Sequence, residues 1–385
     1  MSANDSHKPD TILQHLGEDT HWAGAVTPPI FQTSLFVHES IDQYLSAHEE
    51  GRYTYSRCGN PNLDLAQVKL AALEKAEEGQ LYNSGMSAIT AAIMSETKAG
   101  AHVVCVDTCY GPTRIFLETY LPKFGVTTTF VSGHDPQEIF DACKPETTLI
   151  YLESPSSLIF QFQDLRAISA FAKERGIATC IDNSYASPIY QQPITMGIDH
   201  VVHSGTKYIA GHSDVVCGLH CTSAEKMAVV RKNEMELIGA ALPPFPSWLV
   251  LRGLRTLKLR MERAQETGNT MCQFLKGRSE VTEVFHASDQ DHPQHDLFKS
   301  QMSGSGSLIT FAPAFQDEIK VRQFVESLEI YQMGVSWGGY ESLAMPLKVK
   351  PMHWKEERLL VRLYCGLEDV GDLMDDLDQA FKKIG

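Results

Sequence analysis

The chain has 385 residues, of which 43% are hydrophobic and 21% are charged, and its formal net charge is -15. This balance is typical of a soluble globular protein, and the length predicts two domains because it exceeds what one hydrophobic core usually serves. The negative charge excludes an extended binding surface for nucleic acid or for an anionic membrane, since both would be repelled.

No stretch approaches the ~18 consecutive apolar residues of a membrane span. The start of the chain, Met1 to Lys8, has no apolar signal core, so we expect a cytoplasmic protein. Cysteines such as Cys105 and Cys180 lie inside apolar runs, where a reduced thiol packs as a small hydrophobe. We therefore predict neither a disulfide framework nor a metal site, and the histidine-rich segment 291–296 suits a surface loop.

Residues 1–57 predict an extended N-terminal arm, because they show little apolar periodicity and contain the breaker Thr27-Pro28-Pro29. A helix is predicted to start at Asn60-Pro61, with Asn as its N-cap and Pro at its first position. One face of this helix is predicted from residues spaced by three and four along the chain, Leu65, Val68, Ala72 and Ala76, with Leu73 beside them.

Residues 58–241 predict a large α/β domain. Short apolar runs alternate with helical stretches such as 164–174 and 224–237, which is typical of parallel strands joined by crossover helices. The proline-rich segment 242–246 cannot continue a helix and predicts a boundary. Residues 242–385 then predict a smaller C-terminal α/β domain, with a long helix from Trp248 to about Lys276, a strand at 307–311 and a final helix at 369–383.

Polar residues follow four β-prone runs at 102–106, 148–152, 177–181 and 198–202. The first three runs end in Asp107, Glu153 and Asp182, and the last leads to His203-Ser204-Gly205-Thr206-Lys207-Tyr208. Ligands of open α/β sheets bind at the carboxyl ends of the strands, so these polar residues predict one shared crevice. Lys207 is placed there to react.

The order and spacing of several motifs resemble the Cys/Met-metabolism family of pyridoxal 5′-phosphate (PLP) enzymes, which includes cystathionine lyases and synthases. The motifs are Tyr55-Ser56-Arg57, Ser84-Gly85-Met86, Tyr110-Gly111, Glu153-Ser154-Pro155, Asp182-Asn183, Ser204-Gly205-Thr206-Lys207, Ser336-Trp337-Gly338-Gly339-Tyr340-Glu341-Ser342, and Arg362 before Gly366-Leu367-Glu368-Asp369. The resemblance implies the type I PLP-dependent transferase fold, a mostly parallel sheet flanked by helices with a smaller α/β domain at the C-terminus. It also implies PLP as the cofactor.

The resemblance implies a role for each motif. Lys207 is expected to form the Schiff base with PLP and to move the substrate Cα proton. Asp182 is expected to hold a proton on the pyridine nitrogen, and Tyr110 to stack on the ring. Gly85 and Met86 precede a predicted helix, whose free backbone amides suit the phosphate.

Four further residues match the family's phosphate contacts. Ser204 and Thr206 are expected to add hydroxyl contacts, whereas Tyr55 and Arg57 match residues that come from a neighbouring subunit. The resemblance thus implies a homo-oligomer, at least an obligate dimer and usually a tetramer built of two dimers.

Arg362 is a charge inside an apolar run, and an unpaired buried charge is costly, so a partner is expected: the substrate carboxylate or an internal salt bridge. Ser336-Trp337 resembles bacterial cystathionine β-lyases, and Ser157 stands where γ-acting members usually carry Asn. Val335 departs from both groups. We therefore expect β-elimination of L-cystathionine, a small sulfur amino acid. The alternatives are a γ-lyase, a γ-synthase or a PLP-binding regulatory protein without turnover.

Overall fold

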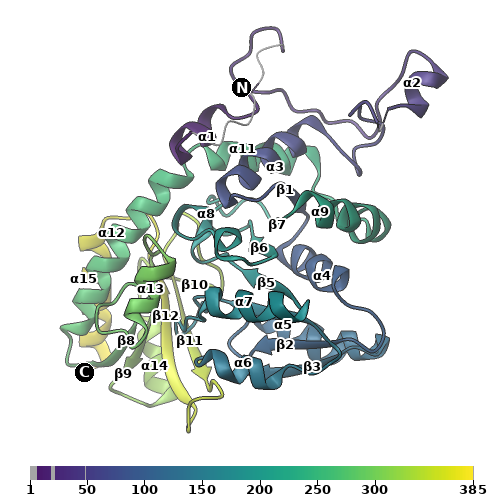
Figure 1. The fold of residues 1–385 in the computed structure, drawn as a ribbon. Coiled ribbons are helices and arrows are strands. Elements are labelled where there is room, and N and C mark those ends of the chain that lie inside the picture. The colour runs from purple at the N-terminus through teal and green to yellow at the C-terminus, as the bar shows by residue number, and fades with distance from the viewer. Residues whose placement is uncertain (1–6, 19–21, 48, 385) are drawn as a thin grey trace.

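The computed structural model describes residues 7–18, 22–47 and 49–384. Its N-terminal segment contains two short helices, α1 (Pro9–His15) and α2 (Ile41–Leu45). Helix α1 packs against α3 and α12, whereas the arm that carries α2 projects away from the rest of the molecule (Figure 1). Ser40 caps α2, and none of the residues of this helix is buried.

The larger sheet has seven strands in the order β1-β7-β6-β5-β4-β2-β3. Its strands are β1 (Glu78–Tyr82), β2 (His102–Val106), β3 (Thr127–Val131), β4 (Thr147–Glu153), β5 (Ala178–Asp182), β6 (His200–Ser204) and β7 (Gly218–Thr222). Strands β3, β2, β4, β5 and β6 are parallel, whereas β7 runs antiparallel to both of its neighbours. The four β-prone runs of the sequence are therefore adjacent parallel strands, with their carboxyl ends at one edge.

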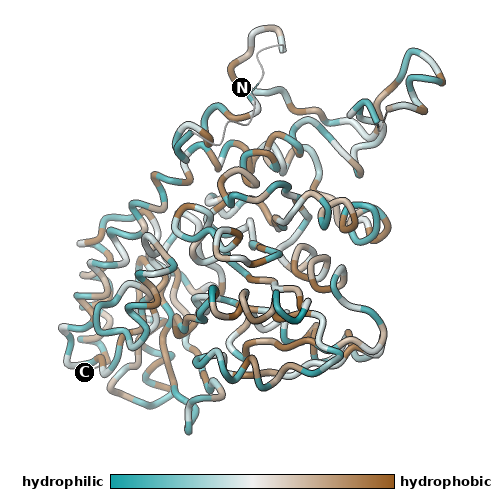
Figure 2. The backbone as a smooth tube through the Cα atoms, in the orientation of Figure 1, coloured by the Kyte–Doolittle hydropathy of each residue, from teal (hydrophilic) through white to brown (hydrophobic). Residues whose placement is uncertain are grey.

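Helices flank this sheet (Figure 1). They are α3 (Pro61–Glu74), α4 (Gly85–Ser95), α5 (Gly111–Ile115), α6 (Pro136–Ala142), α7 (Leu165–Arg175), α8 (Ser187–Tyr190), α9 (Ala224–Val230) and α10 (Glu236–Ile238). Tighter or wider helical turns occur at η1 (Phe116–Tyr120), η2 (Leu121–Phe124), η3 (Pro193–Met196) and η4 (Arg231–Met235). Figure 2 shows hydrophobic and hydrophilic residues alternating along the helices. This alternation is expected where one helix face packs inward and the other faces water.

The smaller sheet has five strands in the order β10-β11-β12-β9-β8. They are β8 (Val281–Phe285), β9 (Leu308–Pro313), β10 (Gln332–Met333), β11 (Leu343–Val349) and β12 (Arg358–Tyr364). The remaining helices are α11 (Pro244–Leu254), α12 (Leu257–Lys276), α13 (His295–Gln301), α14 (Glu318–Glu326) and α15 (Val370–Ile384). A core that includes Phe311, Phe324 and Phe381 fills the space between this sheet and its helices. The mostly parallel larger sheet and the smaller second sheet confirm the predicted fold class.

Two sequence predictions fail in detail. Helix α3 begins after Asn60 as predicted, but its fully buried side chains include Leu63 and Leu70, whereas Val68 of the predicted face is 45% exposed. The proline-rich segment starts α11 rather than ending a helix, since proline is tolerated in a first turn. The predicted helix from Trp248 is therefore two helices with a break at Arg255-Thr256.

The division at residue 242 stays a prediction. Buried residues of α11 belong to the core of the larger sheet. Within the part of the chain that the structure describes, no helix combines the length and the apolar character needed to cross a membrane.

Candidate active site

The amine of Lys207 lies just beyond the carboxyl end of β6. Its Nζ donates a hydrogen bond to Oγ of Ser336 at 2.8 Å and lies 5.3 Å from the centroid of the Trp337 ring. Burial, with a smaller effect of the Arg362 charge, lowers the pKa of Lys207 to about 8. With this pKa about a tenth of the amine is neutral at pH 7, far more than for an ordinary lysine, which suits it to act as a nucleophile and as a base.

The loop that contains Ser336 lies directly against the backbone of Lys207. Gly338 has a φ of +87°, and a Cβ at this position would lie 2.7 Å from the carbonyl carbon of Lys207. Only glycine permits both this conformation and this approach. The sequence singled out the motif around Gly338 but not the reason for the glycine, because the contact joins distant segments.

Asp182 is the last residue of β5 and is buried. Its Oδ1 accepts hydrogen bonds from the backbone N–H of Ser184 at 3.0 Å and from the Ser184 hydroxyl at 2.6 Å. The same hydroxyl oxygen accepts from the backbone N–H of Ser204 at 2.6 Å, so Ser184 joins Asp182 to the end of β6. Burial raises the pKa of Asp182. A cationic partner at this carboxyl group would stabilise its ionised form.

The sequence analysis missed Ser184. Its signal was its position two residues after Asp182, a spacing at which an aspartate side chain commonly accepts a hydrogen bond from the following backbone.

Helix α4 points its free N-terminus at Ser204. Ser84 caps the helix by accepting from the backbone N–H of Ser87 at 3.1 Å, whereas the N–H groups of Gly85 and Met86 make no hydrogen bond within the described residues. A Cβ on Gly85 would lie 3.0 Å from the Cα of Ser204. Unpaired amides and the helix dipole make this corner a favourable anion site.

The hydroxyl of Thr206 has another use in this structure. It donates to the carbonyl oxygen of Cys217 at 3.2 Å and accepts from the backbone N–H of Cys217 at 3.0 Å. These bonds tie the start of the Lys207 turn to the chain before β7. The phosphate contact expected of Thr206 stays a prediction.

Tyr110 and Ser157 are connected through Glu153, the last residue of β4. The backbone N–H of Tyr110 donates to Glu153 Oε2 at 2.7 Å, and that of Ser157 donates to Oε1 at 3.1 Å. The Tyr110 side chain is half exposed and its ring stacks on no other aromatic ring of the described chain. The sequence motif contained Glu153 without a role for it. An acidic residue directly at the end of a buried strand was the available signal, as it was for Asp182.

Arg362 lies on β12 and donates a hydrogen bond through Nη2 to the carbonyl oxygen of Val335 at 2.6 Å. No carboxylate among the described residues lies within ion-pair distance of its guanidinium group. Burial lowers the pKa of Arg362. The internal salt bridge considered from the sequence is thus missing from the described structure, and the group has donors left for an anionic ligand.

Tyr55 and Arg57 make other contacts within their own chain. The Arg57 guanidinium lies 5.6 Å from the centroid of the Tyr55 ring, and it donates to the carbonyl oxygen of Glu236. Both side chains belong to the projecting arm segment, whose neighbours across a cavity of about 1070 Å³ include Val68 of helix α3. No hydrogen bond in the described structure links either residue to the groups around Lys207.

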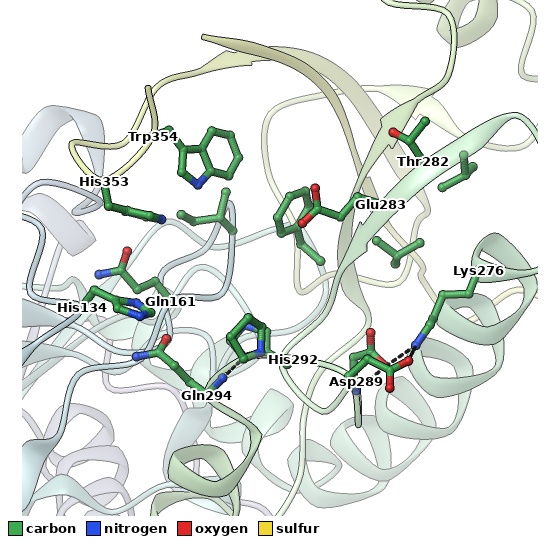
Figure 3. Close-up of a pocket in the computed structure, with 16 residues that line it drawn as sticks. His134, Gln161, Lys276, Thr282, Glu283, Asp289, His292, Gln294, His353 and Trp354 are labelled. Carbon is green, nitrogen blue, oxygen red and sulfur yellow. Dashed lines mark hydrogen bonds and ion pairs between the residues drawn. The ribbon is translucent and has the colours of Figure 1, made fainter. Parts of the chain in front are cut away.

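A separate cavity of about 580 Å³ contains none of the predicted site residues (Figure 3). His134, His353 and Trp354 lie on one side, and Lys276 on the other side binds Asp289 and Asp291. Across the described ranges, no three His, Cys, Asp or Glu side chains are arranged to hold a metal ion. We therefore place the candidate active site at the strand ends.

A model of the family described as "Cys/Met metabolism PLP-dependent enzyme" matches residues 10–382. The chain belongs to this family. This Cys/Met-metabolism enzyme therefore uses PLP, and its strand-end groups fit that cofactor chemically: an amine at Lys207 for the aldehyde, a buried carboxyl group at Asp182 for the ring nitrogen, and the free amides of α4 for the phosphate.

Named relatives of this Cys/Met-metabolism enzyme carry different activities. The chain is 34% identical to cystathionine gamma-lyase of Bacillus subtilis, over 98% of this chain and 100% of the relative. It is 37% identical to cystathionine beta-lyase of Lactococcus lactis subsp. cremoris, over 94% of this chain and 95% of the relative. The crystal structure of metB from Corynebacterium glutamicum superimposes with a TM-score of 0.92 at 30% identity, covering 99% of both chains.

Proposed function

We propose that this enzyme cleaves L-cystathionine by β-elimination to homocysteine, pyruvate and ammonia. The observation that carries the proposal is the contact of the Lys207 amine with Ser336 and with the Trp337 ring. The Ser336-Trp337 pair is the feature that resembles β-lyases, and it forms the wall next to the reacting amine. The Lactococcus relative named as a cystathionine beta-lyase supports the same choice.

Lys207 is proposed to hold the cofactor and then to act as the base. When bound, PLP supplies an aldehyde that joins an amine and a ring that draws electrons away from Cα. With the cofactor bound, the Lys207 amine would take the proton from Cα, and the Asp182 carboxylate would hold a proton on the ring nitrogen. The lowered pKa of Lys207, about 8, supports this role because the amine must be neutral to accept a proton.

The cofactor phosphate is proposed to lie at the N-terminus of α4. The backbone amides of Gly85 and Met86 and the hydroxyl of Ser204 would donate hydrogen bonds to it, with Thr206 as a further contact. Tyr55 and Arg57 of a second copy would complete the site. Tyr110 would stack on the cofactor ring and keep it in register with Lys207.

Arg362 is proposed to bind the α-carboxylate of the substrate through its free donors. Ser157 and Ser336 would line the same pocket with Trp337. After the Cα proton is removed, the bond between Cβ and sulfur breaks and homocysteine leaves as a thiolate. The remaining 2-aminoacrylate takes up water and yields pyruvate and ammonia.

A γ-acting enzyme is the second candidate, supported by the Bacillus relative named as a cystathionine gamma-lyase. The two candidates give different keto acids from the same substrate. We expect purified protein with L-cystathionine to yield pyruvate and homocysteine. Formation of 2-oxobutyrate and cysteine would contradict β-cleavage, and no keto acid at all would favour γ-replacement or another substrate.

We also propose that the protein is a cytoplasmic homo-oligomer, with active sites shared within a dimer and a tetramer formed from two dimers. Within the described chain no hydrogen bond links Tyr55 or Arg57 to the groups around Lys207, which supports the shared site. All nine cysteines are free, and most of them are buried, which supports a reducing compartment.

A further inference from the structure

Glu153 connects two loops that each carry a proposed site residue. It ends β4, and its side chain is 5% exposed. One oxygen accepts from the backbone of Tyr110, in the loop after β2, and the other accepts from Ser157, in the loop after β4 itself. A single buried carboxyl group therefore fixes both loops at the strand ends.

Glu153 also lies beside Asp182. The two residues are register partners on adjacent parallel strands, so their side chains point to the same face of the sheet. Burial and the Asp182 charge raise the pKa of Glu153 to about 8. Other titratable neighbours include Cys105 on β2 and Tyr151 on β4, and burial raises the pKa of both, which keeps them neutral at pH 7. The charge of Lys207 acts on Asp182, not directly on Glu153. No cation of the described chain forms an ion pair with Glu153.

We propose that Glu153 is a positioning residue that works as a neutral carboxylic acid, holding the loops of Tyr110 and Ser157 in place without adding a second negative charge beside Asp182. The inference rests on the proposed roles of Tyr110, Ser157 and Asp182. It assigns to Glu153 no contact with the substrate or the cofactor.

The chemistry of the two hydrogen bonds explains why glutamic acid stands here. Two backbone N–H groups from different loops need two acceptor oxygens. A carboxyl group offers two oxygens that can accept, whereas a glutamine side chain has one acceptor oxygen and a nitrogen that only donates. Burial and the Asp182 charge raise the pKa of Glu153 to about 8 and outweigh the two backbone hydrogen bonds, which by themselves lower it, so the group is mostly neutral at pH 7. Asp182 then remains the one anionic group of this pair, and its carboxylate would be free to hold a proton on the cofactor ring nitrogen.

The first test measures the loops in the protein without cofactor. Glu153→Ala should speed hydrogen exchange at the amides of Tyr110 and Ser157 by roughly 3- to 10-fold, because each amide loses its acceptor. The affinity for added PLP should fall by a similar factor, while Glu146→Ala, at an exposed carboxylate just before β4, should change neither quantity. Unchanged exchange at both amides would remove the positioning role.

The second test measures whether Glu153 is protonated in the folded protein. A residue with only a structural role would not produce this pH dependence. In the wild type the folded-state pKa of Glu153, about 8, lies above the unfolded value of 4.5. The stability that this group contributes is therefore fully present below pH 4.5 and is lost as pH rises toward 8. Glu153→Gln cannot titrate, so its Tm relative to the wild type should rise by ~2 °C or more between pH 5 and pH 8.5, whatever the difference at pH 5.

The control for this pH series is Glu146→Gln, whose Tm should follow that of the wild type throughout. A flat or falling difference for Glu153→Gln would show an ionised Glu153 and overturn the proposal. Both tests use the protein without substrate, so a failed product assay with L-cystathionine leaves their outcome unaffected. Glu153→Gln also keeps the proposal testable if Glu153→Ala does not fold.

Discussion

The strand-end site and the N-terminal arm differ in how their side chains are packed and hydrogen-bonded. At the strand ends, Lys207, Asp182 and Glu153 are buried or partly buried and each has a hydrogen-bond partner within the chain. In the arm, apolar side chains have little to cover them: Val37 is 89% exposed and Leu45 is 71% exposed. Exposed apolar surface of this kind is typical of a contact with another chain.

The difference indicates which half of the active site a single chain can build. The parallel strands bring Lys207 and Asp182, the residues for which we propose covalent attachment and proton transfer, near each other within one chain. The arm carries Tyr55 and Arg57, for which we propose contacts with a partner's phosphate, and within the described chain neither forms a hydrogen bond with the groups around Lys207. Substitutions at the strand ends should therefore change chemistry, and substitutions in the arm should change assembly or sharing.

The largest effect is expected from Lys207→Ala. Removing the amine removes both the attachment point and the base, so product formation should fall by about 10²- to 10⁴-fold or more. In the wild type, borohydride should fix the cofactor to a peptide that contains Lys207. Lys123→Ala, at an exposed lysine, should behave like the wild type. Finding the fixed cofactor on another lysine would contradict the assignment.

Arg362→Lys should have the next largest effect. The lysine keeps the charge but loses the planar pair of donors, and the lost contact should lower kcat/KM by roughly 10- to 150-fold. Tm should change little, because the structure shows no ion pair for Arg362 among the described residues.

Arg358→Lys is the matched control for Arg362→Lys, since Arg358 lies on the same strand and pairs with Glu283 at 2.5 Å. It should leave kcat/KM near normal. A loss of stability with normal kinetics for Arg362→Lys would remove that residue from the substrate site.

Arg57→Ala tests whether sites are shared. Alone, it should weaken retention of PLP by about 10-fold, because one charge-assisted contact to the phosphate is lost. Mixed with Lys207→Ala subunits, it should regain part of the activity, since one of the two shared sites then carries neither substitution. If mixed oligomers form and no activity returns, the arm serves its own subunit, where Arg57 already contacts Glu236.

The smallest effect on the single chain is expected from Leu45→Ser in α2. This side chain is exposed, so the stability of the isolated subunit should change by less than about 0.5 kcal/mol. Sedimentation at decreasing concentration should instead show easier dissociation of the oligomer. Ile319→Ser on α14, at another exposed apolar residue, should leave dissociation unchanged. If both variants dissociate equally, α2 is not part of the contact between subunits.

The sequence predicted the strand ends well because the signal there is local. An apolar run followed at once by a polar residue locates both the strand and its carboxyl end, as for Asp182 after β5. The start of α3 was also local, since Asn60 and Pro61 carry the cap. The buried face of α3 was predicted wrongly because apolar residues occur on more than one side of the helix. Two different sets of apolar residues therefore have the spacing of three and four that marks a helix face.

Other features depend on contacts that no local pattern contains. The hydrogen bond between Lys207 and Ser336 joins residues that are 129 positions apart in the sequence. The close approach of Gly338 to the Lys207 backbone joins the same two segments. The break between α11 and α12 was missed for a similar reason, because the helical pattern continues through Arg255 and Thr256. The proline-rich segment was predicted to interrupt helical structure, and instead its prolines lie in the first turn of α11, where proline is tolerated.

The hydrogen bond between Arg362 and Val335 has a consequence for how position 335 can change. Arg362 binds the carbonyl oxygen of Val335, while the Val335 side chain is 74% exposed. This hydrogen bond uses the backbone, so it does not depend on which amino acid occupies position 335. A substitution at this position would change an exposed side chain next to Ser336 while the hydrogen bond that holds Arg362 is kept, so position 335 can vary at little cost to the structure.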